Sequence, residues 1–316
     1  MLFNLDMPNH SRVRRVVNGP YGSGGVRSLE RVLDEVLDER CAALRAQSSP
    51  DLYETVLDEV TIRVNSTFLG LRLSDREHYR RLGQTLLRMP ADDIHGLRGA
   101  IGALYDYVLW LIHHERELAP DGFVHRLVAG RHDSDPPLTD DELVAILLLS
   151  VVGGDQNVLS VLTKSVYTLL VARPLWERLV ANPEIAPDLV EELIRLIPVG
   201  RISTFPRVST RPIVTSHGEL PAGTAVYADA FAANRDPLAF PAPRTIDPTR
   251  RGARHVQFGY GMHHCMASAL ARLEITAVIG RLAREFPRLE LTVPPESLPW
   301  DTGTLLRRPT TLPVRW

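Results

Sequence analysis

A cysteine set between a glycine-containing loop and an apolar helix is the feature that most constrains what this chain can fold into. Cys265 follows Gly259 and Gly261, and the apolar pattern of a helix starts almost at once, near Ala267. Glycines let backbone approach a flat ligand closely. The N–H groups and the dipole at a helix N-terminus favour a thiolate, which is one of the few protein ligands that suit haem iron. The run therefore predicts a haem-thiolate site; the alternative is a cysteine that is merely buried before an amphipathic helix.

Length and composition place the chain among ordinary globular proteins. Its 316 residues suffice for one large domain or two medium ones, with 44% hydrophobic and 23% charged residues. The net charge of -2 gives no bulk attraction to nucleic acid or to a membrane surface. Two cysteines cannot form a disulfide framework, and we find neither a signal-peptide pattern nor an apolar run of membrane-spanning length. We therefore expect a cytoplasmic protein with no nucleic-acid or membrane partner.

Apolar residues at helical spacing predict helices along most of the chain, beginning within about ten residues of Met1. The predicted helices cover Ser28–Ala46, Tyr53–Phe68, Arg76–Leu87, Leu97–Glu117, Thr139–Leu170, Leu189–Ile197 and Ala267–Phe286. Cys41 takes an apolar position in the first of them, so it is interpreted as a core residue. The neighbours His113 and His114 resemble a metal-binding pair, but adjacent helical residues point about 100° apart, which favours a surface face.

The longest predicted helix carries a start signal and an interruption. Thr139 and Glu142 form a capping-box pattern at its beginning. Gly153 and Gly154 lie in its middle, where each weakens a helix by about 1 kcal/mol. Either the glycines allow close packing of another helix, or they open a widened turn beside a ligand. We favour the ligand, because the cysteine loop already predicts one.

The pattern changes after Ile197. Arg207–Thr210, Ile213–Thr215 and Ala225–Tyr227 are predicted as short strands, separated by turn signals at Gly218 and Gly223. Residues 234–254 contain four prolines and few apolar residues, which indicates an irregular but ordered meander. The predicted fold class is therefore mainly α with small β-sheets, in a single domain over residues 1–316.

The cysteine loop resembles the haem-binding loop of the cytochrome P-450 family, written F-G-x-G-x-H-x-C-x-[GA]-x-x-L-A-R. The matching residues are Phe258, Gly259, Gly261, His263, Cys265, Ala267, Leu270, Ala271 and Arg272. Glu192 and Arg195 resemble the family's E-x-x-R motif, which locks the meander behind the haem loop. The family adds a third group from the meander, and Arg244 and Thr245 both remain candidates here.

The resemblance implies a cofactor and the residues that bind it. The cofactor is heme b, with the Cys265 thiolate as axial ligand of the iron and Phe258 in the cofactor-binding loop. His10 and Arg14 resemble the H-x-x-x-R pair of the family's C-helix, which reaches the haem propionates. Arg207 and His263 are expected to bind propionates as well, since cations and imidazoles suit carboxylates; the alternative for each arginine is an ordinary surface position.

The long helix departs from the family pattern. The family has [AG]-G-x-[DE]-[TS], whose acid and alcohol help to deliver protons to the iron site. With Gly153 and Gly154 as its start, Gln156 takes the place of the acid and Asn157 that of the alcohol. Glutamine does not titrate near neutral pH, although both amides can hydrogen-bond water. We expect these four residues to line the distal side of the haem, without the usual proton route.

The resemblance begins at the family's C-helix. The N-terminal region that precedes this helix in the family is absent from the sequence, so the expected fold is a cytochrome P-450-like fold that is N-terminally truncated.

The resemblance implies a haem-thiolate monooxygenase, an oxidoreductase that acts on a small or medium organic substrate in bacterial specialised metabolism. Electrons would come from a ferredoxin or flavodoxin-type donor, for which Arg250, Arg251 and Arg254 could form a docking patch; a solvated charge run is the alternative. Two other functions remain open. One is a haem enzyme with peroxide activation or rearrangement chemistry, and the other is a catalytically silent binding module.

Overall fold

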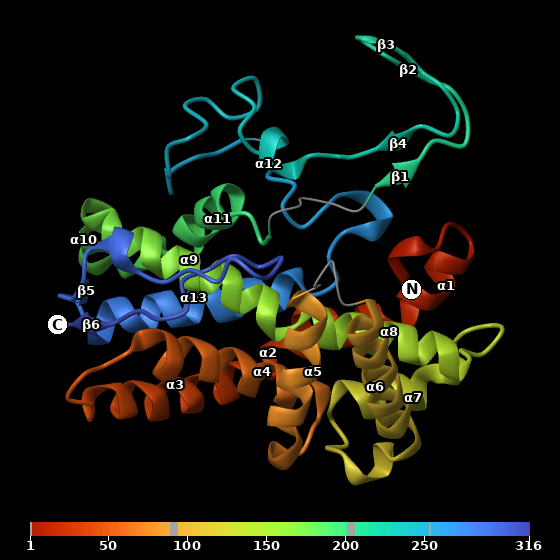
Figure 1. Ribbon diagram of the computed structural model, residues 1–316, viewed down its shortest axis with the longest axis horizontal. Coiled ribbons are helices and arrows are strands. Elements are labelled where there is room, and N and C mark those ends of the chain that lie inside the picture. The colour runs from red at the N-terminus through yellow and green to blue at the C-terminus, as the bar shows by residue number, and fades with distance from the viewer. Residues whose placement is uncertain (1, 89–93, 201–205, 253) are drawn as a thin grey trace.

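The structure is a computed structural model, and it describes residues 2–88, 94–200, 206–252 and 254–316. Most of these residues are helical (Figure 1). The helices of the first half are α1 (Asn9–Tyr21), α2 (Ser23–Arg27), α3 (Glu30–Arg45), α4 (Glu59–Leu69), α5 (Arg76–Arg88), α6 (Ile94–His113) and α7 (Phe123–Ala129). Those of the second half are α8 (Asp140–Gly153), α9 (Asp155–Val171), α10 (Arg173–Ala181), α11 (Ala186–Leu196), α12 (Ala230–Ala233) and α13 (Ser268–Glu285). A π-helical turn, Tyr53–Asp58, precedes α4.

The strands form antiparallel pairs rather than one sheet. They are β1 (Arg207–Val208), β2 (Ile213–Thr215), β3 (Gly218–Leu220), β4 (Ala225–Val226), β5 (Glu290–Leu291) and β6 (Val314–Arg315). The pairs are β1 with β4, β2 with β3, and β5 with β6, in the registers Arg207↔Val226, Ile213↔Leu220 and Glu290↔Arg315. The β2–β3 hairpin extends away from the helices in Figure 1. The predicted class of a mainly helical chain with small sheets is therefore confirmed.

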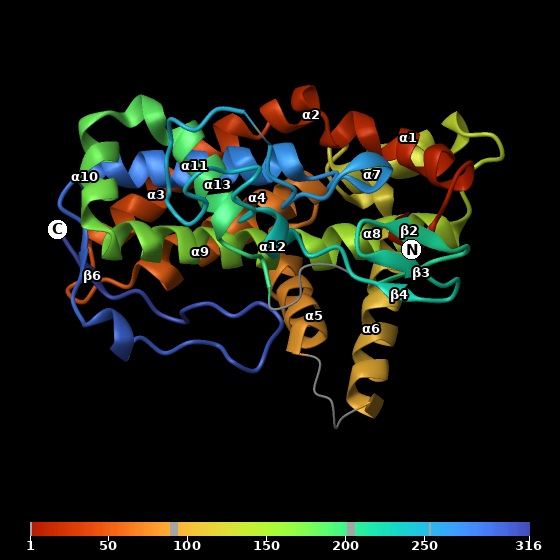
Figure 2. The same ribbon diagram turned by 90° about the horizontal axis from the view of Figure 1, so that it is seen from above.

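The core lies where α3, α4, α9 and α13 pack on one another, and Figure 1 shows α3, α9 and α13 running nearly parallel. Amphipathic patterning explains this arrangement, since the buried positions of α3 are Leu33, Val36, Leu37, Cys41 and Leu44. Cys41 is fully buried among them, as predicted. Helices α5 and α6 lie side by side and project from one flank of this core (Figure 2).

The long helix is broken into α8 and α9, and the break falls at the predicted glycines. Thr139 Oγ1 accepts a hydrogen bond from the Glu142 N–H (3.3 Å), and a Glu142 carboxylate oxygen accepts one from the Thr139 N–H (3.0 Å), so the capping box is confirmed. Gly154 then leaves helical geometry at φ -75° and ψ -93°. The predicted single helix is therefore two helices that share almost one axis.

The α8–α9 segment also corrects the prediction about membrane-spanning runs. Residues Asp140–Val171 are long and apolar enough to cross a bilayer. However, 56% of their most apolar window is buried in the protein, and the segment contains Asp155 and Lys164. A stretch that is buried on most sides is apolar all round because it crosses the core.

Lys164 is the only lysine of the chain, and it joins α9 to the residues that follow α11. Its ammonium group donates to the carbonyl oxygens of Pro198 and Val199, and Ser160 Oγ donates to the same Val199 carbonyl at 3.0 Å. Burial and then the charge of Arg308 lower the pKa of Lys164 to about 8. These bonds fix the short segment between α11 and the strands against the central helix.

The two histidines after α6 do not form a metal site. His113 is exposed and pairs with Asp140 at 3.3 Å, whereas the His114 ring binds the Trp110 carbonyl. Among the described residues, no group of three or more histidine, cysteine or acidic side chains could hold a metal ion. This agrees with the interpretation of the pair as part of a helix surface.

Candidate functional site

The cysteine loop is shaped by two glycines in left-handed backbone conformation. Gly259 has φ 75° and Gly261 has φ 70°, values that side chains with a Cβ rarely adopt. The loop closes when the Cys265 N–H donates to the Phe258 carbonyl at 2.7 Å, and α13 starts three residues later. The sequence therefore fixes the loop locally, and the loop presents the Cys265 thiol at the beginning of a helix.

Burial raises the pKa of the Cys265 thiol, although the Ala267 N–H and the charges of Arg14 and Arg272 act in the opposite direction. The helix start thus favours the thiolate, as expected, while burial acts against it. A metal ion bound to a thiol deprotonates it outright.

A cavity of about 340 Å³ opens in front of Cys265. Its walls are mostly apolar and come from the cysteine loop, α1, α4, α8, α9, α13 and the segment after α11. The lining residues include Tyr21, Asn65, Leu149, Gly153, Gly154, Asn157, Val158, Val161, Ile194, Val199, Phe258, Cys265, Leu270 and Glu274. The structure thus brings the cysteine loop and the glycine break of the long helix to one cavity.

Three of the four predicted propionate ligands line this cavity. His10 and His263 lie with ring centroids 4.5 Å apart, and Arg14 donates to the His264 carbonyl at 2.8 Å. His10 is 2% exposed, yet neither of its ring nitrogens has a partner among the described residues. Burial, and then the charges of His263 and Arg14, lower the pKa of His10. A buried imidazole without a partner is costly unless a ligand completes it.

Arg207 differs from the other three. It lies on exposed strand β1 and is not part of the cavity lining, but its charge is one cause, after burial, of the lowered pKa of His263. It therefore lies at the edge of the group of His10, Arg14 and His263. Together these four positive or neutral donors suit an anionic ligand.

The donor set fits haem. A thiol faces the cavity from one side, and the unpartnered His10 imidazole, the His263 imidazole and the Arg14 guanidinium converge at its edge, where two carboxylates would need them. The apolar walls exclude water and suit a flat macrocycle. These residues were all predicted from the sequence.

Position 154 requires a glycine because another side chain lies close to it. A Cβ atom at Gly154 would overlap the side-chain amide of Asn65, which is itself held by Tyr79. Gly153 has more room, since the nearest atom to its Cβ would be Asn157 Nδ2 at 3.9 Å. The Asn157 amide donates to the Gly153 carbonyl at 3.2 Å, across the break. Both predicted explanations of the glycines hold here, because the break opens to the cavity and also admits Asn65.

We expect Gly154→Ala to destabilise the protein by about 1–3 kcal/mol, because the added methyl group displaces a hydrogen-bonded amide in a packed region. The matched control, Gly153→Ala, should change stability by less than about 1 kcal/mol, since its methyl group finds space. Urea unfolding followed by circular dichroism measures both. Equal losses in the two variants would contradict the steric explanation.

Gln156 does not line the cavity, which corrects the prediction that it faces the haem beside Asn157. Its amide oxygen accepts from Arg308 Nη2 at 2.7 Å, and its amide nitrogen donates to Asp155 Oδ2 at 2.9 Å. The next residue of a helix points about 100° away, so Asn157 faces the cavity while Gln156 faces the C-terminal segment. Of the predicted distal residues, Gly153, Gly154 and Asn157 are thus in place.

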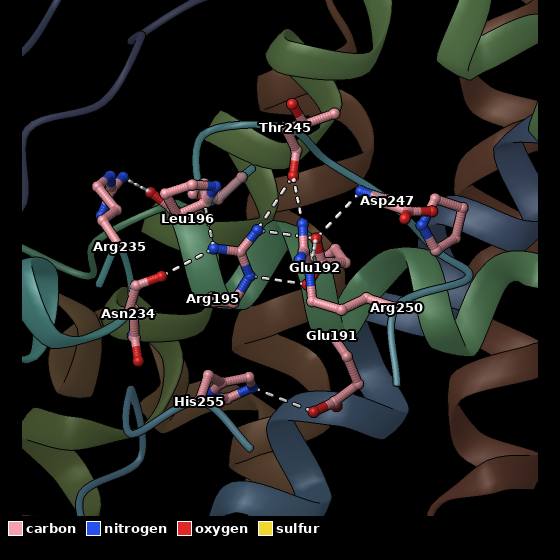
Figure 3. A network of polar contacts seen from close by, with 12 residues as sticks. Glu191, Glu192, Arg195, Leu196, Asn234, Arg235, Thr245, Asp247, Arg250 and His255 are labelled. Carbon is pink, nitrogen blue, oxygen red and sulfur yellow. Dashed lines mark hydrogen bonds and ion pairs between the residues drawn. The ribbon is translucent and has the colours of Figure 1, made fainter. Parts of the chain in front are cut away.

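Behind the loop, Glu192 and Arg195 of α11 form the network drawn in Figure 3. Arg195 is 1% exposed and makes two hydrogen bonds to Glu192, at 2.7 and 2.8 Å. Its remaining N–H groups donate to the backbone carbonyls of Asn234, Pro243 and Thr245 at 2.8, 2.7 and 3.1 Å. One buried guanidinium therefore holds three points of the meander, which explains how so irregular a segment is ordered.

The third member of this network is Arg250. Its Nε lies 3.1 Å from both Glu192 oxygens, and the Asp247 N–H donates to Glu192 at 3.0 Å. Thr245 takes part only through its carbonyl, and the Arg244 side chain has no part in the contacts of Figure 3. Of the two open candidates, Thr245 thus joins the network through its backbone and Arg244 does not, while the third side chain, Arg250, was not predicted in this role. Arg250 is also unavailable for the predicted docking patch, whereas Arg251 and Arg254 are exposed.

Known proteins share this arrangement. The family model described as Cytochrome P450 matches residues 180–314. Nocardicin C N-oxygenase of Nocardia uniformis subsp. tsuyamanensis is 34% identical over 316 residues, which cover 100% of this chain and 79% of that protein. The chain belongs to the cytochrome P450 family. As a P450 it is a haem-thiolate monooxygenase with an iron centre, and it acts on organic substrates.

Further relatives agree with this assignment. Mycinamicin IV hydroxylase/epoxidase of Micromonospora griseorubida is 31% identical and is matched over 79% of its length. The crystal structure of the LnmA cytochrome P450 hydroxylase from the leinamycin pathway of Streptomyces atroolivaceus S-140 superposes with a TM-score of 0.92 at 30% identity, covering 100% of this P450 and 81% of that chain. The chain thus spans about four fifths of the length of its relatives.

Some cavity residues of this P450 were not predicted. Tyr21 and Asn65 lie on the cavity wall, and Glu274 is 2% exposed there with one carboxylate oxygen that has no partner among the described residues. Burial, and then the charge of Asp155, raise the pKa of Glu274 well above its usual value. In the sequence, Glu274 could have been found because it lies nine residues after Cys265, on the buried face of α13.

Glu191, beside Glu192, ties α11 to the haem loop of the P450. It accepts hydrogen bonds from Arg272 and pairs with His255 at 3.1 Å, and Arg272 lies over the Phe258 ring at 4.5 Å. Burial opposes its charge, but the hydrogen bonds from His255 and Arg272 lower the pKa of Glu191 to about 2. When the pKa of a carboxyl is lower in the folded state than in the unfolded state, its charge stabilises the fold at pH values above the unfolded-state pKa. This stabilisation is lost as the pH falls toward the folded-state pKa.

We therefore expect Glu191→Gln to lower the free energy of unfolding by about 1 kcal/mol near neutral pH, a figure reduced for the partial exposure of the carboxylate. The difference from the parent protein should shrink as the pH falls from the usual 4.5 toward 2. Urea unfolding at several pH values checks this. A difference that stays constant with pH would contradict the lowered pKa.

Proposed function

We propose that Cys265 supplies the thiolate ligand of the haem iron and that His10, Arg14, His263 and Arg207 hold the haem carboxylates. The single observation that carries this proposal is the unpartnered, buried His10 imidazole, which shares the cavity with Arg14, His263 and Cys265. When bound, haem supplies the one-electron and dioxygen chemistry by which an oxygen atom enters the substrate. Phe258 and the apolar wall of α13 exclude water from the sulfur.

The residues of α8 and α9 form the opposite wall. Gly153 and Gly154 leave space at this wall of the cavity. The Asn157 amide donates to the Gly153 carbonyl and so holds the broken turn in place. Neither Asn157 nor the displaced Gln156 can give up a proton near neutral pH. We infer that protons reach this cavity through water bound to the Asn157 amide, not through an acid and an alcohol of the helix.

The lack of an acid and an alcohol at Gln156 and Asn157 also favours a second function, the use of peroxide. A peroxide already carries both the oxygen atoms and the protons that a missing relay would have to deliver. Turnover with hydrogen peroxide, and none with reductant and dioxygen, would support this function; coupled turnover with reductant and dioxygen would exclude it.

The substrate is proposed to be a small or medium apolar molecule of bacterial specialised metabolism. The cavity walls away from His10 and Arg14 are formed by aliphatic side chains such as Leu149, Val158 and Val161. Relatives whose names give a substrate act on nocardicin C and mycinamicin IV. Helices from both ends of the chain share one hydrophobic core, which supports the assignment of residues 1–316 to a single domain. The proposed location is the cytoplasm, as expected from the sequence.

The electron donor is proposed to be a ferredoxin or flavodoxin-type protein. Arg251 and Arg254 are exposed near the outer end of the meander, and among the described residues the one ion pair of Arg251 is with the exposed Asp188 at 3.2 Å. An acidic partner would meet these arginines without breaking a buried pair. Reduction rates that fall with rising salt, and fall further in Arg251→Gln, would support the patch.

The decisive experiment is the difference spectrum of the reduced protein with carbon monoxide. A thiolate-type absorption shows that the purified chain binds haem through a cysteine, as proposed. A haem-free protein, or a spectrum of the histidine-ligated type, would refute the assignment of Cys265. The spectrum also separates an active haem site from a silent binding module.

A further inference from the structure

A second cavity lies across α9 from the haem cavity. Its volume is about 170 Å³, and the two cavities are separated by the helix, since Gln156 lines the one and Asn157 the other. The C-terminal segment after β5 runs alongside α9 toward α5 (Figure 2), and its residues form part of the cavity wall. Its lining is mostly polar and consists of Tyr53, Gln84, Gln156, Asp301, Thr304, Leu306 and Arg308.

Arg308 is the central group of this cavity. It is 7% exposed, and its hydrogen-bond partners among the described residues are all neutral: the Gln156 amide oxygen at 2.7 Å and the Tyr53 hydroxyl at 3.3 Å. In the described part of the chain, no carboxylate lies within ion-pair distance of its guanidinium; the charge of Arg308 acts on the pKa of Asp58, but the Asp58 carboxylate pairs with Arg80. Nη1 donates to none of the described residues. A buried charge normally has a counter-ion, because desolvation is otherwise uncompensated.

The neighbouring residue, Arg307, is not buried, so burial of the guanidinium is specific to position 308. Arg307 is exposed and lies over the Trp300 ring at 5.8 Å, as surface arginines commonly do. Arg308 points inward instead, although the outward side of the segment was available to it. Its charge also contributes, after burial, to the lowered pKa of Lys164.

Other lining groups indicate the kind of ligand. Thr304 Oγ1 is buried and has no partner among the described residues. Asp301 lies next to Arg308 across the segment, since its N–H donates to the Arg308 carbonyl at 2.9 Å, but its Oδ1 accepts from the Gly303 N–H at 3.1 Å. A carboxylate in the lining disfavours a doubly charged anion such as phosphate, while one unpaired guanidinium suits a single negative charge.

We propose that this cavity is a binding site for a small monocarboxylate, distinct from the haem site and held by Arg308. The planar guanidinium matches a carboxylate in geometry as well as in charge. Nη1 donates to the ligand, and the Thr304 hydroxyl donates a further hydrogen bond. The space would otherwise hold several ordered waters, because each needs only roughly 10–15 Å³ of such volume. Water is the competing occupant that the experiment must exclude.

The experiment titrates the haem-loaded protein with acetate and propionate in isothermal calorimetry, with acetamide as the neutral match in shape and phosphate as the doubly charged anion. We expect one site per chain for acetate or propionate, and at least about tenfold weaker binding of acetamide and phosphate. Acetate binding no stronger than that of acetamide would mean that only water occupies the cavity. Tighter binding of phosphate would overturn the charge argument.

Variants assign the binding to this cavity. Arg308→Gln should weaken acetate binding at least about tenfold, whereas Arg307→Gln should leave it unchanged. Thr304→Val keeps Arg308 and the fold, and should weaken acetate severalfold, so it replaces Arg308→Gln if that variant does not fold. Acetate binding that survives both Arg308→Gln and Thr304→Val, or that is lost in Arg307→Gln, would overturn the site.

Discussion

Changing Cys265 to serine should abolish the thiolate-type spectrum of the reduced carbon monoxide complex and lower turnover at least about 100-fold. Removing a residue that only supports a metal ligand costs about 10–100-fold, so removal of the ligand itself should cost no less. The serine hydroxyl stays protonated near neutral pH and is a poor substitute for a soft ligand. Absorption spectroscopy of the purified variant, together with its haem content, measures the effect.

The second cysteine provides the matched control. Cys41 is fully buried in α3, far from the cavity lining, so Cys41→Ser makes the same atomic change in the core. A buried hydroxyl without a partner should cost about 1–3 kcal/mol of stability. The spectrum should keep its thiolate character. A thiolate spectrum that persists in Cys265→Ser would show that another group ligates the iron.

Glu192→Ala should destabilise the protein by about 3–5 kcal/mol and release haem, because it leaves Arg195 buried without its carboxylate. The Glu192 side chain joins Arg195, Arg250 and the Asp247 N–H, so one substitution loosens α11 and two points of the meander. Hydrogen bonds from these groups lower the pKa of Glu192 although burial opposes its charge, which indicates a carboxylate in the folded state. Urea unfolding and haem retention during gel filtration are the measurements.

Glu191→Ala is the control for this prediction, since the neighbouring carboxylate is 40% exposed and its loss should cost about 1 kcal/mol or less. Both glutamates make ion pairs with arginine, so burial is the main difference between them. A Glu192→Ala protein that unfolds at the same urea concentration as Glu191→Ala would mean that the buried network carries little stability.

The features predicted correctly are those that neighbouring residues determine. The cysteine loop needs left-handed backbone at Gly259 and Gly261, and the sequence shows both glycines at fixed distance from Cys265. The capping box of Thr139 and Glu142 is likewise a property of four consecutive residues. The pairing of Glu192 with Arg195 follows from their spacing of three on one helix face.

The features predicted wrongly depend on segments far away in the chain. Gln156 is turned toward Arg308, which follows it by 152 residues, and no local pattern shows that the C-terminal segment passes there. Arg250 joins Glu192 because the meander folds back, while Arg244 differs from it in no way visible along the chain.

The single lysine gives the chain an unusual chemical property. Reagents that acylate amines find one side-chain target, Lys164, and its ammonium group is held by the Pro198 and Val199 carbonyls. With a pKa lowered to about 8, a good part of the group is neutral in mildly alkaline buffer, and we expect access to the buried amine to limit its reaction. Val199 is also part of the haem cavity wall. The rate at which Lys164 becomes acylated therefore reports how often this part of the wall opens, and a bound substrate should slow it.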